Sequence, residues 1–390
     1  MTAYRSRRAI RRRQRQRGGF TLVELLIALT AGLIAVTSIY FVSAASSKHF
    51  SEQQKVAQTQ TQLRMAMEQI RRDVSRAGFL GMPDSLNESF CGTPPVRLRG
   101  IEMFDDDSTG ELAHNSLNNV SVDRLLLTGN YATSDGYSVD GDIRGQSSIR
   151  LQNGIAGAAD QAFRRSFFNQ ATAAYDTALF DAVFTNNRLL HIRLHNGSHF
   201  LSRITGTNAG ASSVTVSPAP SGECLGSTSG AILAPISQIE YVLVDSGDAA
   251  VAALGTGSLV PGADPEVLLR RELDFAGNVV AGSERIVAEY VVEFDVDIVT
   301  DTGGAGAAPI WATLNDGAAE NALSVDASDA RLARIRLSVR TPTEDSRFPF
   351  VARGVNAPLT SYDLTADTDG AARVRTLTTD VQLSNFQTIL

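Results

Sequence analysis

A carboxylate at the start of a long apolar run is the feature of this sequence with the clearest chemical consequence. Glu24 precedes the 21 residues Leu25–Ala45, none of which is charged. A charge inside a membrane-length apolar helix costs roughly 2.5–3.5 kcal/mol and usually has a partner. If the chain is cut after Gly19, the new amine of Phe20 lies four residues from Glu24. That amine could neutralise the acid within the chain or on a neighbouring copy; the alternative is an acid that reaches the lipid headgroups.

The residues before the apolar run favour such a cut. Residues 1–19 carry eight Arg and no acid, and they end in the small residues Gly18 and Gly19. An ordinary signal peptide has its small-residue cleavage site after the apolar core, whereas here the small residues come before it. The arginines fit a cytoplasmic topology signal better than an RNA-binding arm, because the apolar run follows directly. Cleavage after Gly19 would remove the leader and keep the apolar segment.

The two cysteines, Cys91 and Cys224, lie outside the apolar run and are too few to form a zinc site unaided. In an exported domain they predict a single disulfide. Closing a loop of about 130 residues would stabilise the fold by roughly 4–5 kcal/mol on the chain-entropy model. Two unpaired buried thiols are the alternative.

Three histidines at intervals of four, His191, His195 and His199, would lie on one face of a helix and could bind a transition metal there. The sequence LLHIRLHNG alternates as a strand instead, with Leu190, Ile192 and Leu194 facing inward. We therefore expect His191, Arg193 and His195 to face solvent near a turn.

The acidic loops give a weak calcium signal. The sequence Asp367-Thr368-Asp369-Gly370 is similar to the middle of an EF-hand loop, but Thr365 and Thr376 stand where the first Asp and the bidentate Glu belong. Asp105-Asp106-Asp107 fits a solvated loop better than a metal site. We expect no cofactor.

Neither catalysis nor nucleic-acid binding is expected. The sequence has no nucleophile elbow, phosphate-binding loop, dinucleotide fingerprint or zincin helix. The acids of EFDVDIV (293–299) alternate with apolar residues and predict a half-exposed strand, not a catalytic pair. Without residues 1–19 the chain carries 27 Lys and Arg against 42 Asp and Glu, a net charge of −15, which argues against a nucleic-acid partner.

A long helix should connect the apolar run to the rest of the chain. Residues 46–77 contain no Pro or Gly and are rich in good helix formers. An apolar stripe at helical spacing, Val56, Leu63, Met67, Ile70 and Val74, predicts that this part packs on the following domain. Gly78 is placed to end a helix that begins near Leu22 and is roughly 80 Å long.

After residue 80 the pattern changes to that of a β-rich domain, which we call the head. The predicted strands are Val122–Leu127, Leu189–Leu194, Ser213–Ser217, Ile236–Val244, Ile286–Val299, Ala333–Val339 and Ala372–Leu383. Residues 158–182 could add helix, and 205–213, 245–264 and 301–308 predict loops. We expect an α+β fold: a leader (1–19), a transmembrane and assembly helix (20–45), an amphipathic helix (46–78) and the head (79–390). A division of the head into two lobes, the first ending near residue 220, is one arrangement considered.

The sequence Gly19-Phe20-Thr21-Leu22-Val23-Glu24, followed by LLIAL, resembles the leader junction of type IV prepilins and type II secretion pseudopilins. That resemblance implies cleavage between Gly19 and Phe20 by a prepilin peptidase, N-methylation of Phe20, and a role for Glu24 in filament assembly. Three further segments, 71–81, 331–342 and 373–385, resemble PilW-like minor pilins.

The resemblance implies a minor pilin of a type IV pilus that primes assembly near the tip. Its partners would be other minor pilins, the major pilin and the inner-membrane assembly platform. The chain would cross the bacterial inner membrane once, with its head in the periplasm, and then enter the pilus at the cell surface. The alternatives are a J-type pseudopilin of a type II secretion system, an adhesin displayed on a pilus, and an anchored protein that never polymerises.

Overall fold

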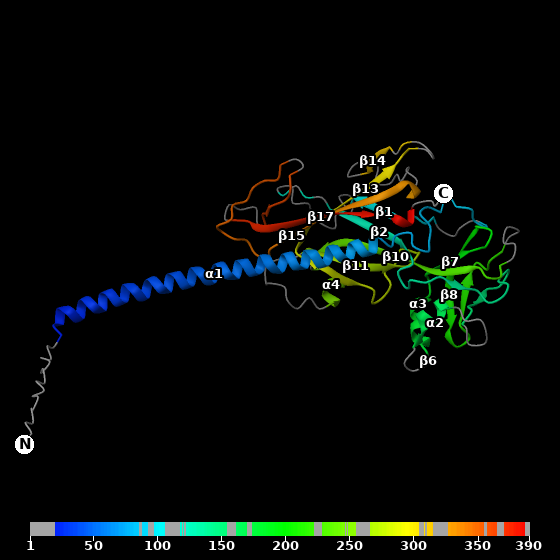
Figure 1. Ribbon diagram of the computed structural model, residues 1–390, viewed down its shortest axis with the longest axis horizontal. Helices are drawn as coiled ribbons and strands as arrows, with labels where there is room; N and C mark the ends of the chain where they lie inside the picture. The colour runs from blue at the N-terminus through cyan, green and yellow to red at the C-terminus, as the bar shows by residue number, and fades with distance from the viewer. Residues whose placement is uncertain are drawn as a thin grey trace, which may run out of the picture. The chain divides into compact units, whose positions relative to one another are not determined.

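The chain forms two compact units, Met1–Lys55 and Val56–Leu390, and helix α1 (Leu22–Val74) begins in the first and ends in the second. Figure 1 shows the computed structural model as a ribbon. It describes residues 20–85, 88–92, 97–105, 118, 120, 122–153, 161–169, 174–221, 228–245, 247, 249–254, 266–303, 308, 310–314, 327–354, 357–364 and 370–386.

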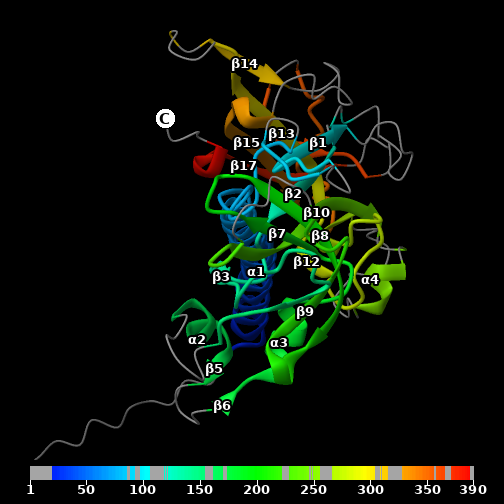
Figure 2. The ribbon, with the colours of Figure 1, turned by 90° about the vertical axis from the view of Figure 1, so that its right-hand side faces the viewer.

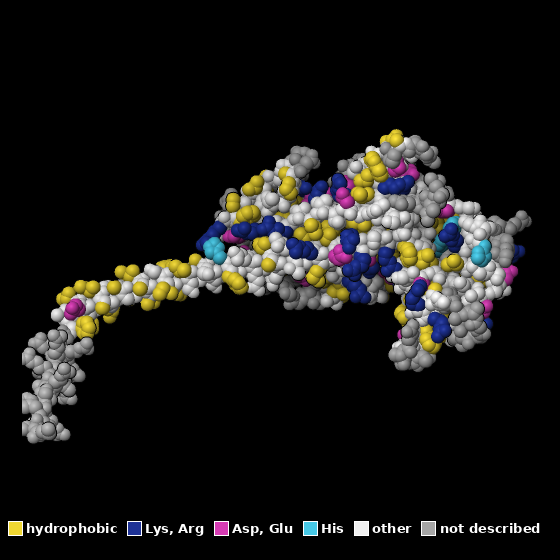
Figure 3. Space-filling view, viewed as in Figure 1, with side chains coloured by type: hydrophobic (Ala, Val, Ile, Leu, Met, Phe, Trp, Pro, Cys, Tyr) yellow, Lys and Arg dark blue, Asp and Glu magenta, His cyan; other side chains and the backbone are white. Residues whose placement is uncertain are grey.

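The first half of α1 is apolar and exposed. Every residue from 20 to 51 is exposed, including Leu29, Ile34 and Phe41, and hydrophobic side chains cover this part of the helix in Figure 3. Among the described residues, α1 is the helix long and apolar enough to cross a membrane by length and composition.

The second half of α1 is amphipathic and half-buried. Its buried side chains are Thr59, Leu63, Ala66, Met67, Ile70 and Val74, spaced by threes and fours so that they share one face. They join a core formed with strands of two sheets. The predicted stripe is therefore confirmed, except that Val56 is only half-buried.

Within the described residues, the larger sheet is antiparallel and has ten strands. They are β1 (Ile101–Asp105), β2 (Asp123–Gly129), β3 (Tyr137–Ser138), β4 (Ser148–Arg150), β7 (Leu189–Arg193), β8 (His199–Asn208), β9 (Ser213–Ser217), β10 (Ile232–Asp245), β11 (Glu266–Leu273) and β12 (Arg285–Glu289). The 14-residue β10 pairs with β2, β3, β7 and β11 and so holds the sheet together.

The second sheet, as far as the structure describes it, has five strands in the order β14-β13-β15-β17-β16. Their bounds are β13 (Val291–Asp301), β14 (Trp311–Leu314), β15 (Ala330–Arg340), β16 (Ser361–Tyr362) and β17 (Ala372–Gln382). The smaller elements are α2 (Gln161–Phe167), β5 (Phe168–Asn169), β6 (Ala174–Tyr175), α3 (Thr177–Val183) and α4 (Ala249–Ala253). Figures 1 and 2 both show α2, α3 and β6 at the end of the second unit that lies away from β13 and β14.

Two large apolar clusters fill the second unit. One combines the buried face of α1 with β2, β10, β13, β15 and β17. The other centres on aromatic rings of β3, α2 and α3, among them Tyr137, Phe167 and Phe180. The predicted α+β fold, with a long N-terminal helix packed on a β-rich head, is confirmed.

Two predictions about local structure were wrong. The strand expected over 286–299 is broken at Tyr290, whose φ of +58° is in the left-handed region, so β12 and β13 belong to different sheets. The loop expected over 205–213 instead contains the end of β8 and a short 3₁₀ turn, Ala209–Ala211.

The expectation of a half-exposed strand over 293–299 was also wrong at its first acids. Glu293 is 0% exposed and Asp295 is 5% exposed. Glu293 accepts hydrogen bonds from Ser338 Oγ at 2.5 Å and Arg353 Nη1 at 2.7 Å. Arg353 comes from the long connection between β15 and β16, which covers a strand face that alternation alone would leave to solvent. Glu293 is therefore part of a structural ion pair whose hydrogen bonds are satisfied.

We predict that the buried stripe of α1 is a major source of stability in the second unit. Ile70 is fully buried, so Ile70→Ala should lower the free energy of unfolding by about 2–5 kcal/mol. Gln60→Ala, on the exposed side of the same helix, should change it by less than about 0.5 kcal/mol. Urea unfolding of the detergent-solubilised chain measures both, and equal effects would contradict the packing described.

Candidate processing and assembly site

Glu24 closes a hydrogen-bonded ring at the start of α1. Thr21 N donates to Glu24 Oε2 at 3.1 Å, and Glu24 N donates to Thr21 Oγ1 at 3.2 Å. The hydroxyl of Thr21 also donates to Glu24 Oε2, at 3.2 Å. This reciprocal arrangement is a capping box, which satisfies backbone donors that the first turn of a helix leaves free. The sequence signal for this capping box is the pattern Thr-x-x-Glu at residues 21–24, which the sequence analysis did not include.

The capping box holds the carboxylate of Glu24 next to the residue where a processed chain would begin. Phe20 is the first described residue and is 87% exposed. Residues 1–19, including Gly19 and the leader arginines, lie outside the described residues. The uncut chain has a peptide nitrogen at Phe20, so a charged amine can form there only after cleavage.

Hydroxyl groups in the middle of the apolar half of α1 bond to the backbone of their own helix. Thr30 Oγ1 donates to Ile27 O at 2.9 Å, Thr37 Oγ1 to Leu33 O at 2.7 Å, and Ser38 Oγ to Ile34 O at 2.9 Å. These bonds back to the preceding turn reduce the cost of placing hydroxyls in hydrocarbon.

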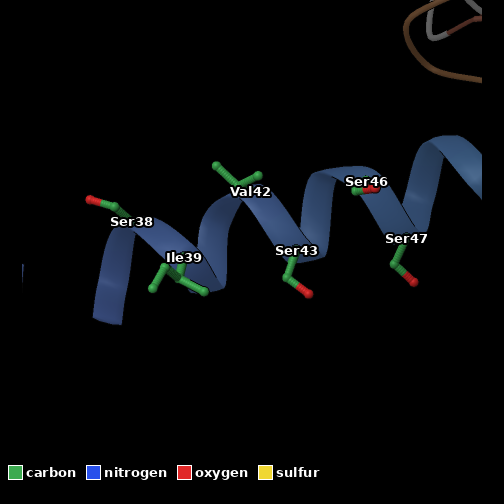
Figure 4. Close-up of a pocket in the computed structure, with 6 residues that line it drawn as sticks. All are labelled: Ser38, Ile39, Val42, Ser43, Ser46 and Ser47. Atoms are coloured by element: carbon green, nitrogen blue, oxygen red, sulfur yellow. The ribbon is translucent and has the colours of Figure 1, made fainter. Parts of the chain in front are cut away.

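A shallow depression on α1 is not a ligand pocket. Its lining residues are Ser38, Ile39, Val42, Ser43, Ser46 and Ser47. Figure 4 shows that all six project from consecutive turns of one helix, so the depression has no second wall. Four of the six residues are serines, whose small side chains would let another helix approach closely.

The end of α1 is tied to the sheets by Asp73. Its Oδ2 accepts hydrogen bonds from Tyr241 Oη at 2.8 Å and from Arg270 Nε at 2.6 Å. Its carbonyl accepts another from Tyr131 Oη at 3.0 Å. Burial, followed by the charge of Asp73, raises the pKa of both tyrosines, so they remain hydrogen-bond donors. This contact fixes the register of the helix against β10 and β11.

The turn after α1 is closed by the C-terminal segment. Asn385 Nδ2 donates to Ser75 O at 3.1 Å and Ala77 O at 3.0 Å, which satisfies carbonyls at the helix end. Gly78 has a φ of +72°, and its nitrogen donates to Thr128 O at 2.8 Å. A side chain at Gly129 would lie 2.9 Å from Arg76 O, so only glycine allows this close approach.

His191 was wrongly expected to face solvent. It lies on a strand as predicted but is 4% exposed. Its Nδ1 lies 2.8 Å from Leu80 O, and its Nε2 lies 2.7 Å from His199 Nδ1. Because a carbonyl can only accept, His191 Nδ1 carries a proton and the neutral ring accepts at Nε2 from His199. The turn after α1 covers this face of β7, and the sequence did not predict that contact.

Burial, and then the neighbouring His199, lower the pKa of His191 from 6.5 to about 4. Burial also lowers the pKa of His199, and Glu88 opposes that shift. The site favours neutral imidazoles. Leu190, Ile192 and Leu194 are buried as predicted, and His195 is exposed.

The other candidate sites fall partly outside the described residues. Cys91 is 2% exposed, and the described residues include no free cysteine; Cys224 lies outside them. Residues 365–369 and Asp106-Asp107 also lie outside, and Thr376 is part of β17. Within the described ranges, no group of three or more His, Cys, Asp or Glu could hold a metal ion.

We predict that His191 makes the second unit acid-sensitive. Its folded pKa lies below the unfolded value, so the unfolded state binds more protons between about pH 6.5 and 4, and stability falls as the pH falls through that window. The loss should be about 3 kcal/mol. His191→Gln should remove most of this pH dependence, whereas His195→Gln should retain it. Urea unfolding at pH 7 and pH 4 measures this loss. An equal loss of unfolding free energy in His191→Gln and wild type would show that His191 is not its source.

Residues 14–40 match the family described as "Prokaryotic N-terminal methylation motif". No curated protein and no solved structure matches the chain. The motif implies processing by a prepilin peptidase and pilus-type assembly. It also indicates a structural rather than a catalytic protein, consistent with insertion in the inner membrane and then entry into a pilus or secretion apparatus. With its long N-terminal helix packed on β-rich sheets, the chain is a type IV prepilin- or pseudopilin-like protein.

Proposed function

We propose that the chain is a PilW-like minor pilin that primes assembly of a type IV pilus and lies near its tip. The observation that carries this proposal is the methylation motif at residues 14–40, joined to a helix whose first half is exposed and whose second half is built into a large head. Such a chain is suited to placing its apolar half among neighbouring helices, first in the membrane and then in a filament.

The three segments that resemble PilW-like minor pilins meet in space, which supports this assignment. Residues 71–81 form the end of α1 and the turn after it. Segments 331–342 and 373–385 include most of β15 and β17, which pair along nine positions from Leu332 to Arg340. Asn385, at the end of the third segment, caps carbonyls of the first. The resemblance therefore falls on one contact region.

Processing supplies the charge that assembly needs. A peptidase would cut between Gly19 and Phe20 and methylate Phe20. The resulting ammonium would pair with Glu24, preferably on a neighbouring subunit, where low dielectric strengthens the attraction. Leader arginines would keep the N-terminus cytoplasmic and the head periplasmic before assembly. A J-type pseudopilin of a type II secretion system shares the same motif and remains the second candidate.

We predict that Cys91 and Cys224 form the disulfide of the exported head. Cys91 is buried beside β8, where its nitrogen donates to His199 O at 2.8 Å. A disulfide there would join the segment after α1 to the middle of the head. Peptide mapping without reduction should find the Cys91–Cys224 peptide pair. Alkylation of both cysteines without prior reduction would disprove the pairing.

We predict that Glu24 is required for incorporation into filaments and not for insertion or cleavage. Glu24→Ala makes the span more apolar and leaves the Gly19–Phe20 bond unchanged, so membrane insertion and processing should persist. The amount of the variant in sheared pili, relative to membranes, should fall at least about tenfold, because an ammonium in hydrocarbon then lacks its partner.

Glu24→Gln is the matched control for this experiment. Its amide oxygen can still accept from Thr21 N, so it retains the capping box and removes only the charge. It should fail to incorporate in the same way as Glu24→Ala. If Glu24→Gln, or Glu24→Ala, reaches sheared pili at the wild-type level, the proposed charge pairing is wrong.

A further inference from the structure

The outward side of the second half of α1 carries arginines that the fold does not use. Arg64, Met65, Glu68, Arg71 and Arg72 are spaced so that they share the side of α1 opposite its buried stripe; we call them the arginine face. Met65 is 68% exposed, and the side chain of Arg72 is 73% exposed. Figure 3 shows Lys and Arg side chains gathered over this part of the helix and the strands beside it.

The arginine face has a positive charge that its own carboxylate does not balance. Glu68 lies 2.8 Å from Arg71 and 3.6 Å from Arg72, and the Arg71 hydrogen bond lowers the pKa of Glu68. Arg64 has no hydrogen bond or ion pair with a described residue. The face therefore has three guanidinium groups and one carboxylate, which pairs with two of them. This leaves a net charge of +2 along roughly 12 Å of helix.

This charge is opposite to that of the rest of the processed chain. Beyond residue 19 the protein has a net charge of −15. A partner that covers the arginine face must be anionic, and the exposed Met65 in its middle adds an apolar contact. Arginines bind carboxylates in bidentate geometry, which favours a protein surface that presents Asp or Glu.

A membrane surface does not fit this position. Basic lipid-binding clusters lie immediately beside a membrane span and contain about four to eight Lys or Arg. Here 18 largely polar residues separate Arg64 from Ala45, the end of the apolar run, and the face contains fewer arginines.

We infer that the arginine face docks on an acidic surface of a neighbouring subunit in the filament. This inference rests on the proposed function, because it requires a filament. It adds to the Glu24 contact a second electrostatic contact, one that involves the part of the helix carried by the head. The Glu24 contact would set the register of the helices, and the arginine face would select which subunit lies beside this one.

A charge-reversal experiment tests this inference in cells. Arg64→Glu/Arg72→Glu changes two exposed side chains, so membrane insertion, cleavage and protease resistance of the head should match wild type. The amount in sheared pili relative to membranes should fall at least about tenfold. Arg150→Glu reverses an exposed arginine of β4 and should leave incorporation unchanged. Incorporation of the double variant at the wild-type level overturns the inference.

A second measurement does not depend on the behaviour of the reversed variant. Arg64→Lys/Arg72→Lys retains the charge and places amines on the face, so it should enter filaments within about threefold of wild type. A carbodiimide then activates carboxylates that touch these amines, and an amide bond forms with loss of the urea. Mass spectrometry should find the new amine at position 64 or 72 joined to an Asp or Glu of another subunit.

The outcomes separate this inference from the proposed function. The docking inference alone is overturned if the lysine variant enters filaments but forms no crosslinks there. It is also overturned if the only crosslinks join its lysines to Glu68 of the same chain. Loss of the reversed variant from membranes, with unchanged processing, would assign the face to lipid and also overturn it. Absence of the wild-type chain from sheared pili would instead refute the proposed function.

Discussion

Everything in this protein depends on a helix that must be stable in two environments. The first half of α1 exposes apolar side chains throughout residues 20–51, and the hydroxyls of Thr30, Thr37 and Ser38 bond back to their own helix. The second half buries one face in a core shared by two sheets. The hydrophobic effect therefore requires a bilayer or other apolar helices around the first half, while the second half holds the head on the same helix.

The junction between α1 and the head is built to keep its geometry. Asp73 reaches from the last turn to Tyr241 and Arg270, and Asn385 returns from the end of the chain to cap the same turn. A charged hydrogen bond in a partly buried site is directional, so these contacts specify register where the apolar stripe alone would allow sliding. The orientation of the arginine face relative to the head follows from that register.

The sequence predicted the features that depend on residues within one helix or strand. The long helix with its end at Gly78, its buried stripe and most strands could be predicted, because period and glycine placement act within one element. The burial of His191 and Glu293 could not, because it depends on which distant segment covers a strand face: the turn at Leu80 in one case and the connection carrying Arg353 in the other. The break at Tyr290 was also missed, since a tyrosine at positive φ has no sequence signal. At the candidate site, the chemistry of Glu24 was predicted, but the role of Thr21 as its capping partner was not.

The most direct test of this account is the mass of the N-terminal peptide of the mature chain. The chain from cells with an active prepilin peptidase should begin at Phe20 and carry one added methyl group on its amine, with the apolar run retained. A peptide that still contains residues 1–19, or a mature N-terminus beyond residue 45, would contradict it, because the ammonium that Glu24 is proposed to pair with would then be absent.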